Sequence, residues 1–193
     1  MFLADGIRSR ASATPSELHD RQLAACKAAS LLGASEPAFH LLPDNRLDTV
    51  AVLEVAKIVE GELARFRPDI IYTHHIGDLN VDHRAVAEAV AVAARPQAAV
   101  KVRAIYGFEV LSSTEWAFTD PVPFRPRRFV DITRQIERKC QAMACYDFES
   151  RAFPHPRSPE AIRALATTRG AVAGFYAAEA FSIYREIITY ASD

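Results

Sequence analysis

The sequence lacks a hydrophobic run long enough to cross a membrane. No stretch approaches the roughly 18 apolar residues that a membrane-spanning helix needs, although 50% of the 193 residues are hydrophobic. The segment Met1 to Gly6 is too short and too uncharged for a secretory signal peptide. We therefore expect one α/β domain over residues 1–193, located in the cytoplasm, with a full hydrophobic core.

An excess of charge is also missing. The formal net charge is -1, which gives no reason to expect a nucleic-acid or anionic-membrane partner. There are only three cysteines, Cys26, Cys140 and Cys145, and they do not have the spacing of metal ligands. Such an odd, unspaced set is typical of reduced and buried thiols in a cytoplasmic protein.

Glycine-rich phosphate loops are absent as well. The chain has 7 glycines, and they form neither of the two common nucleotide-binding patterns. This counts against a sugar-nucleotide-binding α/β domain without excluding it.

Short apolar runs alternate with segments of helical periodicity. The apolar runs lie at 2–4, 38–42, 70–73, 102–110 and 129–131, and the helical segments at 16–31, 50–66, 83–94, 132–146 and 159 to about 190. Strands that alternate with helices of this length predict a mainly parallel sheet with helices on both faces.

Polar residues follow the predicted strands at their carboxyl ends. Parallel sheets bind ligands at this edge, so the loops after Ala4, Leu42, Thr73 and Val110 should share one rim. The rim would hold Asp5, Arg8, Arg10, Asp44, Asn45, His74, His75, Asp78, Asn80, Asp82, His83 and Glu115.

The densest polar cluster is THHIGDLNVDHR at residues 73–84. Imidazoles and carboxylates that converge after a buried strand are typical of a catalytic zinc site, in which a carboxylate often orients the ligand His. A simpler interpretation stays open, in which Asp82 caps a helix and Asp78 begins a turn. A calcium loop is disfavoured, because the Gly and the closing Glu of such a loop are absent.

Four segments carry a family resemblance. RPDIIYTHHIGDLNVDHRAVAEAV resembles the second motif of the LmbE-like (PIG-L) deacetylases, and FLADGIRSR resembles the second strand and turn of that family. The stretch LLGASEP followed by HLLPDNRLD resembles the A-x-x-L-G and L-P-D segments of the family, and IERKCQAMACYDFES resembles its C-terminal K-x-x-A-x-x-x-Y-x-S pattern. The resemblance implies a Rossmann-like three-layer sandwich and a metal-dependent deacetylase that acts on an N-acetylated amino sugar or a glycolipid precursor.

The resemblance also implies roles for residues. His83 would be a ligand of zinc or another divalent metal, and Asp82 would orient or tune nearby imidazoles. Some relatives carry a His where Asn80 stands, so the role of polarising the carbonyl or donating a proton would fall to His74, His75 or a water. The candidate catalytic set is therefore Asp82, His75 and Asn80, and the candidate substrate-binding set is Arg8, Arg10, Asp44, Asn45 and Asp78.

One family motif, H-P-D-D-E, does not occur in the chain. In the family it supplies the other metal ligands and the catalytic base, so we expect a missing first strand and helix, through a late start or a true truncation. We then expect weak metal binding, negligible turnover, and an open sheet edge at residues 2–4 that makes the chain poorly soluble or pairs with another copy. The alternative function is a non-catalytic remnant of the same fold.

Overall fold

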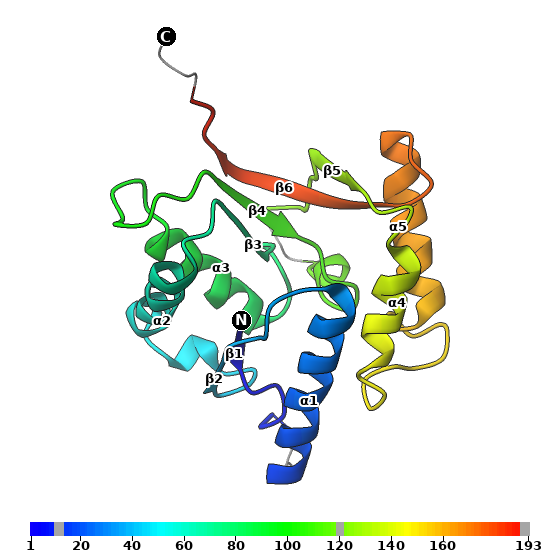
Figure 1. The fold of residues 1–193 in the computed structure, drawn as a ribbon, viewed down its shortest axis with the longest axis horizontal. Helices are drawn as coiled ribbons and strands as arrows, with labels where there is room; N and C mark the ends of the chain where they lie inside the picture. Colours follow the sequence, from blue (N-terminus) through cyan, green and yellow to red (C-terminus); the bar gives the residue numbers. More distant parts are fainter. Residues whose placement is uncertain (10–13, 119–121, 190–193) are drawn as a thin grey trace. The chain divides into compact units, whose positions relative to one another are not determined.

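The structure is a computed structural model, and it describes residues 1–9, 14–118 and 122–189 (Figure 1). A two-stranded sheet joins β1 (Phe2–Ala4) and β2 (Phe39–Leu42), and a four-stranded sheet has the order β3-β4-β6-β5. The chain forms two compact units. Unit 1 consists of residues 1–46 and 129–180, and unit 2 consists of residues 47–128 and 181–193.

Unit 1 combines the two-stranded sheet with three helices. They are α1 (Pro15–Leu32), α4 (Ile136–Ala144) and α5 (Pro159–Ala173). Helix α1 begins with a capping box between Thr14 and Glu17 and ends at Gly33, whose φ of 74° suits glycine. Helix α4 packs against both α1 and α5, and its buried residues Ile136 and Cys140 contribute to the apolar core of the unit. Strand β5 (Arg128–Asp131) leads into this part of the chain.

Unit 2 contains the parallel pair of strands β3 (Ile70–His74) and β4 (Ala104–Phe108), joined through α3 (Val81–Ala93). Helix α2 (Val52–Phe66) packs against α3, and α3 packs against β3. Two 3₁₀ turns, η1 (Leu47–Thr49) and η2 (Thr114–Trp116), lie in the connecting loops. The register pairs His74 with Phe108, so β3 and β4 end at the same level and their following loops begin side by side.

The predicted α/β fold class is confirmed. Strands alternate with helices, and both pairs β1–β2 and β3–β4 are parallel. Helix boundaries differ from the predicted ones by a few residues. Helix α3, for example, begins at Val81 after the cap Asn80, earlier than the predicted 83. The prediction of a single domain stays a prediction. None of the described helices is long and apolar enough to span a membrane.

The prediction of a helix to about residue 190 is wrong. Helix α5 ends at Ala173, before Gly174 with a φ of 80°, and strand β6 (Ala178–Glu186) follows. Strand β6 runs antiparallel to β4, with Phe108 opposite Phe181 and Ala104 opposite Glu186. The hydrogen bonds of this pairing come from a strand about 80 residues away, so local periodicity does not reveal them.

Candidate functional site

The loop that follows β3 is fixed by its own backbone and by Arg84. Asp78 donates its backbone N–H to the carbonyl of His75, and the Arg84 guanidinium donates to the carbonyls of Asp78 and Leu79, both at 2.6 Å. Asn80 then caps α3, because its side-chain oxygen accepts from the backbone of Asp82 at 2.8 Å. These bonds hold the backbone of the loop in one conformation.

Asp78 lies at the centre of this loop. It is 1% exposed, and its Oδ1 accepts from His83 Nδ1 at 2.9 Å and from the Asn80 backbone at 2.9 Å. The hydroxyl of Ser113 donates to Oδ1, and that of Thr114 donates to Oδ2 at 2.6 Å. Burial opposes ionisation, but the hydrogen bonds from His83, Ser113, Thr114 and Asn80 outweigh it and hold the pKa of Asp78 well below its usual range.

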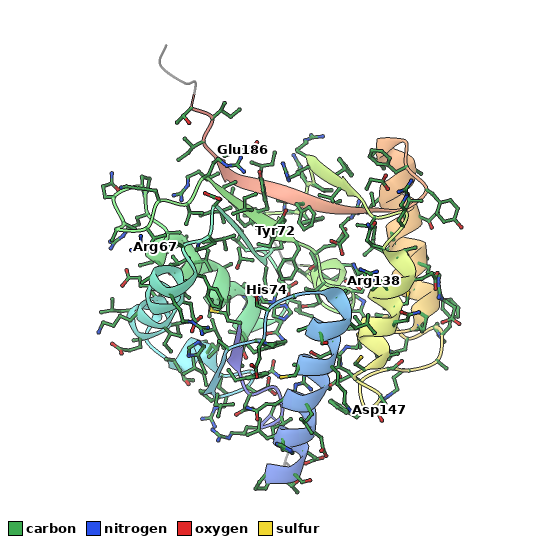
Figure 2. All side chains as sticks on the ribbon, in the orientation of Figure 1. Arg67, Tyr72, His74, Arg138, Asp147 and Glu186 are labelled. Atoms are coloured by element: carbon green, nitrogen blue, oxygen red, sulfur yellow. The ribbon has the colours of Figure 1, made fainter. Side chains whose placement is uncertain are left out.

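The imidazoles of His74 and His83 are stacked. Their ring centroids lie 4.0 Å apart with an angle of 11° between the planes, and the ring of Phe108 lies 4.7 Å from that of His74. Figure 2 labels His74 at the end of β3. Burial, together with the neighbouring His83 imidazole, lowers the pKa of His74 to about 3, although Asp78 acts in the opposite direction. His74 is therefore neutral at neutral pH, and the expected proximity of His74 to His83 is present.

The other histidine of the loop, His75, points elsewhere. It is 1% exposed, and its Nε2 lies 2.7 Å from the carbonyl oxygen of Val122. Since a carbonyl only accepts, Nε2 carries the proton and Nδ1 accepts from the Tyr184 hydroxyl at 3.1 Å. The same hydroxyl accepts from the Ile76 backbone at 2.9 Å. Both ring nitrogens of His75 are thus occupied by groups of β6 and of the loop after β4.

Asp82 is buried, with 7% exposure, and its Oδ1 accepts from the backbone N–H of Leu47 at 2.9 Å. This bond ties η1 to the first turn of α3. The predicted catalytic roles of Asp82, Asn80 and His75 stay predictions, and each of these residues has a hydrogen bond that holds the loop or the helix in place.

The substrate-binding candidates of unit 1 lie in the loops after β1 and β2. Asp44 accepts from the backbone and the hydroxyl of Ser9, so these two loops meet, as the shared edge of parallel strands predicts. Arg8 pairs with the buried Asp5 at 3.1 Å, while most of its side chain is exposed. Asn45 follows Asp44 with a φ of 52°, and its amide donates to Asp44 at 3.5 Å. The prediction for Arg10 lies outside the described residues.

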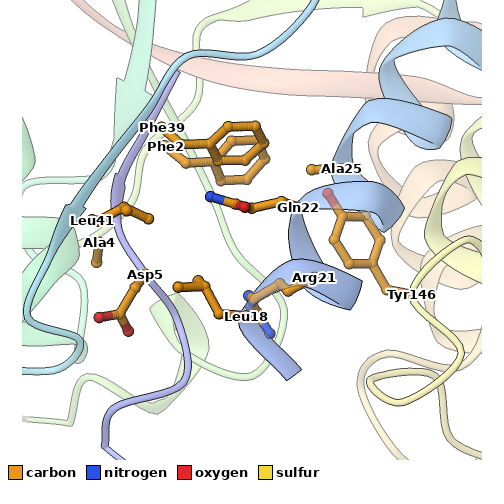
Figure 3. Close-up of a pocket in the computed structure, with 10 residues that line it drawn as sticks. All are labelled: Phe2, Ala4, Asp5, Leu18, Arg21, Gln22, Ala25, Phe39, Leu41 and Tyr146. Carbon is orange, nitrogen blue, oxygen red and sulfur yellow. The ribbon is translucent and has the colours of Figure 1, made fainter. Parts of the chain in front are cut away.

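A pocket opens inside unit 1, between the two-stranded sheet and helix α1. Figure 3 shows the stacked rings of Phe2 and Phe39 on one side, with centroids 5.4 Å apart, and Tyr146 on another. Arg21 reaches its edge and pairs with Glu149 at 2.7 Å. The lining is mainly apolar and brings no group of acids or imidazoles together, so this pocket does not extend the candidate site.

The described residues do not form a metal centre by themselves. Within residues 1–9, 14–118 and 122–189, no three His, Cys, Asp or Glu side chains come together to hold an ion. His83 fits the role of one ligand, because Asp78 holds its Nδ1 and the ring remains 20% exposed. The set of ligands is otherwise incomplete among these residues.

The N-terminal part of the chain matches a known family. Residues 2–94, which include the loop after β3 and the first turns of α3, match the family described as PIG-L: GlcNAc-PI de-N-acetylase. The predicted LmbE-like (PIG-L) resemblance is confirmed over this segment. No curated protein matches the chain significantly.

Three solved structures share the fold. N,N'-diacetylchitobiose deacetylase from Pyrococcus horikoshii is 20% identical with a TM-score of 0.70, and the match covers 95% of this chain and 70% of that one. The conserved protein TT1542 from Thermus thermophilus is 22% identical with a TM-score of 0.70, and the match covers 94% and 79%. GalB, the 4-carboxy-2-hydroxymuconate hydratase from Pseudomonas putida KT2440, is 21% identical with a TM-score of 0.69, and the match covers 95% and 79%. A deacetylase and a hydratase thus share this fold, so the likeness shows the fold alone.

Three residues of the site were not found from the sequence. Ser113 and Thr114 lie in an irregular segment, and Tyr184 lies in a segment predicted to be helical. Ser113 and Thr114 follow a predicted strand, and this position indicates that they lie at the carboxyl edge of the sheet. Hydroxyl residues are common in loops, however, so the position alone does not identify them as site residues.

Proposed function

We propose that the chain belongs to a metal-dependent deacetylase, an amidohydrolase that removes an N-acetyl group from an amino sugar or glycoconjugate. The observation that supports this most directly is the family match over residues 2–94, which includes Asp82 and His83. The buried Asp78–His83 hydrogen bond adds support, since a carboxylate commonly orients a metal-bound imidazole. The family match by itself supports a deacetylase-type function. The amino-sugar substrate and the zinc ion are proposed in addition.

We also propose that the 193-residue chain has negligible turnover and holds zinc weakly. A hydrolytic zinc site commonly keeps three protein ligands and an open position for water, and the described residues offer His83 without such a set. A base that takes the proton of the attacking water contributes about 10²–10⁴-fold to the rate. Asp78 does not fit this role, because it is buried and accepts four hydrogen bonds.

The test measures acetate release from N-acetylglucosamine derivatives, with and without added zinc. We expect no release above background from the chain, together with weak zinc binding that His83→Ala removes and that His19→Ala, at an exposed position of α1, leaves intact. Robust, chelator-sensitive release from this chain would contradict the proposed inactivity.

A second arm separates an enzyme from a non-catalytic remnant. If the gene encodes an H-P-D-D-E segment upstream in frame, the extended chain should release acetate, and His83→Ala should abolish the release while His19→Ala should not. An extended chain with that segment but without activity would contradict the deacetylase proposal.

A further inference from the structure

The loop after β3 and the loop after β4 meet at one buried carboxylate. Asp78 is 1% exposed, and its side chain accepts four hydrogen bonds from three sources: its own loop, α3 and η2 with the residue before it. A substrate-binding role requires an accessible carboxylate, whereas this one is enclosed. Its contacts indicate that Asp78 orients neighbouring side chains instead.

The hydrogen bond between Asp78 and His83 determines which ring nitrogen of His83 carries the proton. A carboxylate that already takes three other donors acts as an acceptor, so His83 Nδ1 must donate across the 2.9 Å separation. In a neutral imidazole the other nitrogen, Nε2, then carries a lone pair. Stacking on His74 restricts the rotation of the same ring.

We propose that Asp78 is the positioning residue of His83: it holds the imidazole as the Nδ1–H tautomer, which leaves the lone pair for a metal ion on Nε2, and Ser113 and Thr114 hold Asp78 in turn. Thr114 is itself oriented, because its hydroxyl accepts from the backbone of Val110 at 2.8 Å and therefore donates to Asp78. The inference that a metal ion binds Nε2 rests on the proposed function, whereas the inference that His83 is the Nδ1–H tautomer does not.

The experiment is a long-range ¹H–¹⁵N correlation spectrum of the histidine rings in the full chain, recorded without metal at a pH of about 9, above the ordinary imidazole pKa of about 6.5. The signals of His83 are those lost in His83→Ala. We expect wild-type His83 to be protonated at Nδ1. Asp78→Asn should keep this tautomer, since its amide oxygen still accepts, and Asp78→Ala should populate both tautomers.

A matched control changes a buried carboxylate far along the chain. Glu149 is 8% exposed and pairs with Arg21 and Arg157, so Glu149→Gln removes a buried charge without touching the His83 contacts. Its His83 signals should match those of the wild type. A purely structural role for Asp78 would lower stability in the variants and leave the tautomer unchanged.

Two results would overturn the proposal: wild-type His83 protonated at Nε2, or an unchanged tautomer in folded Asp78→Ala. If Asp78→Ala does not fold, the wild-type and Asp78→Asn spectra decide, since Nε2–H in either contradicts the proposed positioning. Zinc titration completes the test, with affinity expected to fall about 10–100-fold in Asp78→Ala. Absence of zinc binding beside the Nδ1–H tautomer would contradict the metal role of His83 and leave its positioning by Asp78 in place.

Discussion

Gly107 gives Tyr184 the space to reach the loop after β3. A methyl group at Gly107 would lie 2.3 Å from the Tyr184 hydroxyl oxygen, 2.4 Å from Cζ and 2.7 Å from Cε2. No side chain tolerates such distances, so the ring of Tyr184 must move in Gly107→Ala. The hydroxyl then loses His75 Nδ1 and the backbone N–H of Ile76, its partners in the native fold.

The expected cost of Gly107→Ala is about 2–4 kcal/mol in the free energy of unfolding. Overpacking costs about 1–3 kcal/mol, and leaving the buried Nδ1 of His75 without a donor costs about 1–3 kcal/mol. A gain of about 0.5–1 kcal/mol opposes both, because alanine is stiffer than glycine in the unfolded chain. The displaced atoms belong to the far end of one side chain, which keeps the total below the sum of the two penalties.

A double-mutant cycle in urea tests this reasoning. Tyr184→Ala removes the ring, so Gly107→Ala should be close to neutral in that background, and the coupling should be about 2 kcal/mol or more. Tyr184→Phe keeps the ring but removes the hydroxyl, and it should cost about 1–2 kcal/mol by itself. Equal costs of Gly107→Ala with and without the Tyr184 ring would refute the argument.

Three further perturbations have defined outcomes. Asn80→Ala should destabilise the protein by about 1 kcal/mol in urea unfolding through the lost cap of α3, and a cost near zero would contradict the cap. Asp82→Ala should cost about 1–3 kcal/mol, because the buried N–H of Leu47 loses its acceptor; a denaturation midpoint equal to that of the wild type would count against it. Burial, with the hydrogen bond to Glu186, raises the pKa of Tyr106. The Tyr106 hydroxyl therefore ionises first in the unfolded chain, so the free energy of unfolding falls as the pH rises above about 10. In urea unfolding at a series of pH values, the free energy of unfolding of Tyr106→Phe should fall less steeply over this range.

The sequence determined the class of the fold and the position of the candidate site. Apolar runs such as 70–73 and the helical periodicity of 50–66 are local properties, and the structure has β3 and α2 at these places. The segment from residue 67 to 90 carried the family resemblance, and the family match over residues 2–94 confirms it. The residue types of the loop after β3 therefore pointed to the family whose model matches this segment.

Only the tertiary structure decided what the individual side chains of that loop do. His74 and His75 are neighbours in the chain, yet one stacks on His83 and the other bonds to Tyr184 and Val122. Consecutive residues at the end of a strand point to opposite sides, so the contacts of each depend on what packs there. Ser113 lies 35 positions from Asp78 in sequence, and Tyr184 lies 109 positions from His75. Hydrogen bonds between such distant residues depend on chain pairing, as in the antiparallel addition of β6 to β4, and local patterns contain no information on that pairing.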